Sequence, residues 1–98
     1  MSGGGDRKRS LELLDANHVF PGDYGVSVIA NNDEQVTAAI LAAVQAGASP
    51  LVEGGHEVRP SAKGKYVSHR LTVRCQDAEA VLALYAALRA VTGVITVL

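Results

Sequence analysis

The side chains best suited to binding chemistry gather in residues 59–74, "RPSAKGKYVSHRLTVR". This stretch holds five Lys or Arg, one His and no Asp or Glu. Guanidinium, ammonium and hydroxyl groups of this kind bind carboxylates or phosphates through charge-assisted hydrogen bonds. The same composition also suits a solvated sheet face, so the two interpretations compete. If the stretch is functional, its partner-binding residues are Arg59, Ser61, Lys63, Lys65, Tyr66, Ser68, Arg70 and Arg74.

Two familiar nucleotide-binding patterns do not fit this stretch. Lys63 and Gly64 match the start of the aromatic motif on RNA-recognition domains, but Tyr66 alone cannot form the stacking platform that such domains need. Gly64 and Lys65 join two predicted strands, whereas a phosphate-binding loop joins a strand to a helix. Weak nonspecific nucleic-acid binding through the basic hairpin remains the alternative function.

The chain shows no spacing typical of a catalytic or metal site. His18, His56 and His69 lack metal-ligand spacing among themselves and with Cys75. His69 falls on the inward face of a predicted strand, where a packed, hydrogen-bonded histidine is commoner than a catalytic one. Cys75 ends the same face and is interpreted as a small core residue. We therefore expect no enzyme activity, no metal and no cofactor.

Composition limits the class of protein. With 98 residues, 48% of them hydrophobic, the chain is expected to form one small domain. Its 9 Lys and Arg balance 10 Asp and Glu, which argues against a dedicated nucleic-acid binder. The single cysteine cannot form an internal disulfide, and the N-terminus lacks the apolar run of a signal peptide or membrane span. The cytoplasm is the expected compartment.

Residues 1–16 have the composition of a flexible tail, and residues 17–98 are expected to form the domain. The segment "MSGGGDRKRS" has no apolar periodicity and is expected to be disordered. Leu11, Leu13 and Leu14 could form a short helical turn on the core.

The first half of the domain predicts a strand followed by a helix. Alternation around Val26 and Val28 indicates a half-buried strand from residue 24. A helix over 33–46 follows, with Asn32 as the expected cap and Gly47 as the stop signal. A loop then reaches residue 55.

The second half predicts two strands, a helix and a last strand. "HEVRP" is a short strand with Val58 inward, and Pro60 favours an edge position. Residues 66–75 alternate as the longest strand. Asp77 caps a second amphipathic helix, and "VITVL" forms the final strand.

The predicted order is βαββαβ. With right-handed crossovers it gives an α+β, ferredoxin-like sandwich: a four-stranded antiparallel sheet of order 4-1-3-2 with two helices on one face.

Several segments together resemble the YbeD family of small bacterial proteins of unknown function. They are "FPGDYGVSVIA", "EVRPSAKGKYVSHRLTV", "LYAAL" and "VTGVITVL". The resemblance implies an ACT-like fold and a regulatory or adaptor role. Members of that family commonly carry an aliphatic residue where this chain has His69. Where ACT domains that bind amino acids have a glycine-containing turn, this chain has Asn31, Asn32 and Asp33.

The predicted function is a non-catalytic regulatory or adaptor module that binds an anionic protein or metabolite. Five of the six bases after residue 16 lie within 59–74, so the positive charge is one-sided. The uncharged final strand is expected to be an edge, which favours a homodimer. In the alternative, the segment around Leu11 to Leu14 covers that edge and the protein is a monomer.

Overall fold

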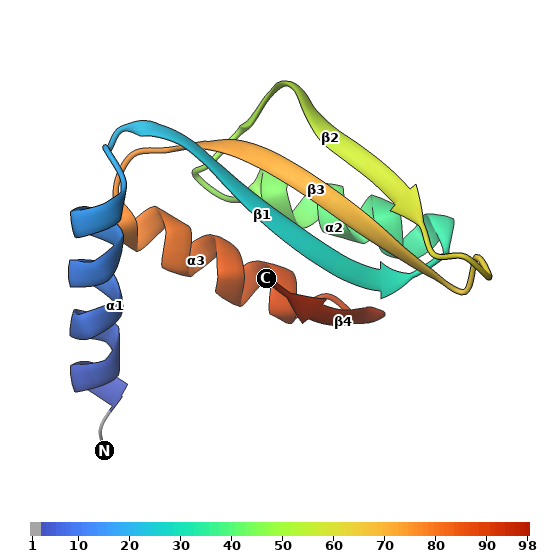
Figure 1. The fold of residues 1–98 in the computed structure, drawn as a ribbon, viewed down its shortest axis with the longest axis horizontal. Helices are drawn as coiled ribbons and strands as arrows, with labels where there is room; N and C mark the ends of the chain where they lie inside the picture. Colours follow the sequence, from blue (N-terminus) through green and yellow to red (C-terminus); the bar gives the residue numbers. More distant parts are fainter. Residues whose placement is uncertain (1–2) are drawn as a thin grey trace.

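The computed structural model describes residues 3–98, which form three helices and four strands (Figure 1). In chain order these are α1 (Gly3–Asn17), β1 (Gly22–Asn31), α2 (Glu34–Ala46), β2 (Leu51–Pro60), β3 (Tyr66–Cys75), α3 (Ala78–Arg89) and β4 (Val94–Val97).

The four strands form one antiparallel sheet of order β2-β3-β1-β4. This is the predicted order read from the other edge. Helices α2 and α3 both cover one face, as Figure 1 shows, and no helix of residues 3–98 covers the opposite face. The ferredoxin-like arrangement is confirmed, with α1 as an additional third helix.

The core lies between the two helices and the central strands. Alternate residues of β1 and β3 are buried because successive side chains of a strand point to opposite faces. The most deeply buried members of the core are Val26, Val28, Ala30, Ile40, Leu71, Val73, Cys75, Val81 and Leu88. The predicted inward faces of both strands are therefore correct.

The cap of α2 differs from the prediction. Asp33, not Asn32, is the N-cap, and its side chain accepts a hydrogen bond from the Gln35 amide at 2.7 Å. Asn32 faces the β2–β3 turn instead: its Nδ2 donates to the Gly64 carbonyl at 2.8 Å, and its amide donates to the Lys65 carbonyl at 3.1 Å. These two bonds hold Asn32 against the β2–β3 turn, and the helix begins one residue later, after Asp33.

Strand β2 begins earlier than expected and is irregular. It starts at Leu51 rather than at residue 56, and its register with β3 shifts between Leu51 and His56. Gly54 adopts a φ of 72°, and a side chain on Gly55 would collide with the Thr72 carbonyl oxygen. These glycines therefore distort the strand without ending it.

The inward burial expected for Val58 is wrong, since this side chain is 52% exposed. Val58 does pair with the buried His69, so it shares the helix-facing side of the sheet. It is exposed because β2 is the edge strand, with a neighbour on one side only.

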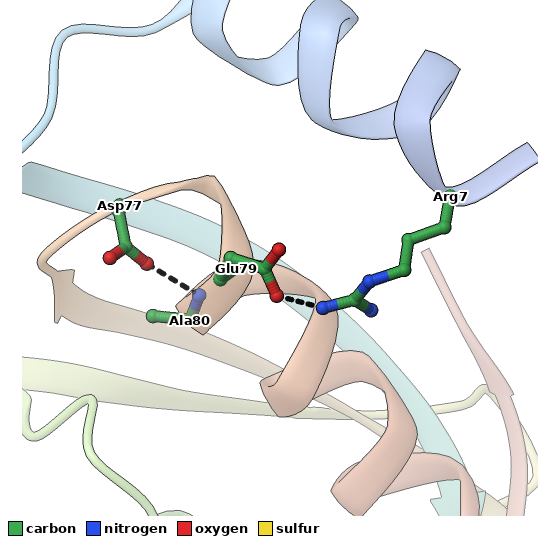
Figure 2. A network of polar contacts seen from close by, with 4 residues as sticks. All are labelled: Arg7, Asp77, Glu79 and Ala80. Carbon is green, nitrogen blue, oxygen red and sulfur yellow. Dashed lines mark hydrogen bonds and ion pairs between the residues drawn. The ribbon is translucent and has the colours of Figure 1, made fainter. Parts of the chain in front are cut away.

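The N-terminal segment is helical from Gly3, where the composition indicated a disordered tail. Leu11 and Leu14 are half-buried, and α1 packs against α3. Arg7 pairs with Glu79 of α3, as Figure 2 shows. The residues after Asp6 have good helix propensity, and α1 packs on α3. Together these two effects offset the entropy cost of ordering the segment. Residues 1 and 2 of the expected tail lie outside the described residues.

An aromatic cluster joins the α1–β1 connection to the domain. The His18 ring lies 4.9 Å from Tyr24, and Tyr24 meets Tyr85 of α3 edge-on at 6.4 Å between centroids. Burial, followed by the hydrogen bond with Tyr24, raises the pKa of Tyr85 to about 12. Tyr85 is thus a neutral packing residue at physiological pH.

The free edge of β4 is not covered by α1, which stands at the opposite end of α3 in Figure 1. Ile95 and Leu98 are exposed beside this edge. The arrangement differs from the alternative in which the leucines of the N-terminal segment cover the edge and the protein is a monomer. A homodimer through β4 stays a prediction.

Replacing Leu88 with alanine should lower the free energy of unfolding by about 2–5 kcal/mol, because truncating the buried side chain leaves a cavity. The matched control is Leu98→Ala, which truncates a side chain that is 66% exposed and should change stability by less than about 0.5 kcal/mol. Urea denaturation measures both, and equal losses would contradict this core.

Candidate anion-binding face

The face of the sheet without helices carries the polar partners of the buried core residues. The register places Ser27 beside Arg70 and Arg70 beside Glu57 in one row across β1, β3 and β2. In the next row, Ser68 lies between Ile29 and Arg59. Three strands therefore bring polar side chains together on this face, next to the apolar Ile29.

A shallow hollow of about 330 Å³ opens on this surface. The small side chains of Ser27 and Ser68 are half-buried within it, while Glu57, Arg59 and Arg70 are exposed. Serine hydroxyls donate and accept hydrogen bonds, and arginine donates two parallel ones to a carboxylate or phosphate. The hollow can therefore receive an anionic group, with Glu57 as the single acid of its lining.

Ser27 and Glu57 were not among the predicted site residues. The alternation of β1 already placed Ser27 opposite the core. Only the β1–β3 pairing brings it beside Arg70, although the two residues are more than forty positions apart in the sequence. For Glu57, the sequence predicted an outward-facing side chain but not its position in the lining of the hollow.

Most of the predicted bases are free to bind a partner. Within the described part of the chain, Arg59, Lys63, Lys65 and Arg70 form no ion pair. Arg74 differs, because it lies 3.6 Å from the Asp23 carboxylate toward the other end of β3. It is thus separated from the hollow and partly neutralised.

The β2–β3 turn holds Lys63 and Lys65 in an exposed position. The Gly64 amide donates to the Ser61 carbonyl at 2.9 Å, and the Tyr66 amide donates to Ser61 Oγ at 3.3 Å. Ser61 therefore closes the turn rather than facing a partner. The Lys65 ammonium lies 5.4 Å from the centre of the Tyr66 ring, which is exposed at the rim of the same face.

On the other side of the sheet, His69 is fully buried and bonds to His56. His56 Nε2 lies 2.9 Å from His69 Nδ1, and the two rings stack at 17°. The second nitrogen of His69, Nε2, is buried without a partner among the described residues. Burial, reinforced by the neighbouring His56, lowers the pKa of His69, so this imidazole is neutral at neutral pH.

Two other site classes find no support within residues 3–98. No group of three or more His, Cys, Asp or Glu side chains there could hold a metal ion. No helix of this range has the length and apolar character required to cross a membrane.

The fold is that of an ACT-like domain. The crystal structure of the ACT domain from GTP pyrophosphokinase of Chlorobium tepidum superimposes with a TM-score of 0.63 at 18% identity, covering 78% of this chain and 94% of that one. The solution NMR structure of the same domain gives 0.60 at 19% identity, covering 78% and 84%. At this identity the likeness describes the fold alone.

Within that class, the chain belongs to the family described as protein of unknown function (DUF493), the YbeD-like family. The family model matches residues 15–98. The match begins near the end of α1 and includes the whole sheet. No curated protein matches the chain significantly.

Replacing Gly64 with valine should destabilise the protein by about 1–2 kcal/mol, because its φ of 72° is costly for a residue with a Cβ. No atom lies within 4 Å of the added Cβ, so the cost is conformational and not steric. Gly64→Asn is the matched control, since asparagine tolerates this region better. Thermal melts compare the variants, and equal effects would exclude backbone strain as the cause.

Acidification should destabilise the protein through His69. Its folded pKa lies below the unfolded value of 6.5, so the unfolded state binds more protons in the window below that value. The contribution of His69 to the free energy of unfolding is fully present above pH 6.5. It falls as the pH drops toward the folded pKa, by up to about 1.4 kcal/mol per pH unit.

Urea denaturation from neutral to acid pH, on wild type and His69→Leu, measures this contribution. The leucine variant differs from wild type only at residue 69, so every other titratable group is the same. It should therefore lose stability less steeply than wild type between about pH 6.5 and 5. Parallel profiles would show that His69 does not contribute.

Proposed function

We propose that this protein is a non-catalytic regulatory or adaptor module that binds an anionic protein segment or metabolite on the helix-free face of its sheet. The observation that carries the proposal is the hollow on that face, where Arg59 and Arg70 stand beside two serines without an ion-pair partner in residues 3–98.

Electrostatics support this assignment. Arg70 and Arg59 project from neighbouring strands, and Lys63 and Lys65 extend the positive charge along the turn. The sheet fixes the backbone of both arginines before a partner arrives, which reduces the backbone entropy lost on binding. The single acid, Glu57, leaves the group with a net positive charge.

The ACT-like fold agrees with a binding role, but it does not identify the ligand. The two similar structures are both of a domain from a GTP pyrophosphokinase, and that activity belongs to the enzyme that contains them. For this chain, the proposed partner is defined by its negative charge alone.

Nonspecific nucleic-acid binding is the weaker hypothesis. Tyr66 is the one aromatic ring of the basic hairpin, and Lys65 already lies near it. A backbone-only mode would depend steeply on salt. A shift of labelled single-stranded DNA that persists at physiological salt would favour nucleic acid over the proposed partner.

Neutralising the two arginines should weaken anion binding by about tenfold or more, because each loses charge-assisted hydrogen bonds. The test variant is Arg59→Gln with Arg70→Gln. The probes are pyrophosphate and a short polyglutamate peptide, titrated while amide chemical shifts are recorded at constant ionic strength. Shifts should gather around Ser27, Ser68 and the turn.

The matched control is Lys8→Gln with Arg9→Gln, which removes the same charge from exposed positions of α1. It should leave the affinity within about twofold of wild type, since distant exposed charges are screened. Equal losses in both double variants, or saturable binding retained by the arginine variant, would refute the site. Circular dichroism and melting curves confirm that both variants fold.

A further inference from the structure

The buried histidine pair fastens the edge strand β2 to the interior of the sheet. His69 is 0% exposed, yet one of its nitrogens bonds to His56 and the other bonds to nothing in the described residues. The His56–His69 hydrogen bond is a side-chain link between β2 and β3. On its other edge β2 pairs with no strand of the described residues.

This bond requires that the facing His69 nitrogen and His56 nitrogen share one proton. In the neutral pair, either ring can donate to the other. One added proton on either ring preserves the bond, because one proton still lies between the two facing nitrogens, but it puts a positive charge on the pair. A second proton breaks the bond, since two N–H groups then face each other and two cations stack.

No countercharge faces the pair on the helix side of the sheet, within the part of the chain that the structure describes. Val28 and Val58 flank His69, and Leu71 pairs with His56. Helix α2 has one charged residue, Glu34, in its exposed first turn, and β4 has none. The uncharged titratable groups of this side are Tyr24, Cys75 and Tyr85.

The charged groups of the adjoining elements are directed elsewhere. In β1 and β3, Asp23, Arg70 and Arg74 lie on the helix-free face. The charged groups of β2 and α3 are exposed, and none of them bonds to either imidazole in the described residues: Glu53, Glu57, Arg59, Glu79 and Arg89.

The least costly response to protonation of both rings is a movement of β2. His69 lies on the inner strand β3, between β1 and β2, and cannot reach water without breaking the core. Strand β2 is bonded on one side only, and its pairing is already interrupted between Leu51 and His56. Glu57 and Arg59, close to His56 in the chain, form one wall of the hollow on the opposite face.

We propose that the His56–His69 pair is a proton-sensitive fastening of β2, which acid releases, so that the wall of the anion-binding hollow loosens below neutral pH. The loss of anion binding rests on the function proposed above, whereas the release of β2 does not.

Hydrogen exchange of backbone amides tests the release directly. Protection factors, corrected for the intrinsic rate, are compared at about pH 7.5 and about pH 5.5, a range in which histidine titrates. In wild type, protection of the β2 amides should fall about tenfold or more, which corresponds to about 1.4 kcal/mol of opening free energy. Protection of the β1 amides should change less than about twofold, because the opening is local.

Three variants make the test specific. His69→Leu removes the titrating group and should abolish the acid response of β2. His56→Gln keeps a donor for His69 Nδ1 and should reduce the response, which serves if the leucine variant fails to fold. His18→Gln replaces the exposed third histidine and should respond as wild type does.

The outcomes separate the two proposals. Equal loosening of β1 and β2 in wild type, or an unchanged β2 response in both His69→Leu and His56→Gln, would overturn the fastening. Pyrophosphate titrations run in parallel address the site: binding that persists in acid while β2 is released would contradict the hollow and leave the fastening supported.

Discussion

The packing of α2 and α3 on one face of the β1–β3 pair is the interaction on which the rest of the structure depends. These two strands pair along their whole length, so each buried residue has a neighbour on the next strand that points to the same side. Burying one side fixes the other as solvent-facing. The apolar core thus decides, through the period of the strands, where Ser27, Ser68 and Arg70 must appear.

The two edges of the sheet are unlike each other. Strand β2 is ten residues long but irregular, with glycines that break its register and a proline at its end. Such features discourage edge-to-edge association. Strand β4 has only four residues, and the large hydrophobic side chains exposed beside it are aliphatic. The basic hairpin belongs to this irregular edge, whose backbone is poorly suited to pairing with another strand.

The histidine pair explains how a polar residue occupies a fully buried position of β3. An imidazole at His69 buries a polar nitrogen at a cost of about 1–3 kcal/mol when it has no partner. His56 satisfies only one of the two nitrogens. The core therefore tolerates His69 as a neutral group, and the same burial makes it sensitive to acid.

How much the sequence determined differs from element to element. Period-two alternation identified β1 and β3 and their inward faces, and the Asp77 cap located the start of α3, because these signals are local. The strand order followed from the rule on crossover handedness. For the site, the sequence identified Arg59, Ser68 and Arg70 as candidates, since a one-sided charge cluster is visible without a structure.

Only the tertiary structure decided what distant residues do to one another. The contact of His56 with His69, the place of Ser27 beside Arg70 and the separation of Arg74 depend on register, which local patterns do not encode. Helix α1 was missed because its order comes from docking on α3 and not from its own periodicity. The burial of Val58 was predicted wrongly for a similar reason. Alternation shows which side of the sheet a residue faces, but burial also depends on whether another strand lies next to its own, and β2 is an edge strand.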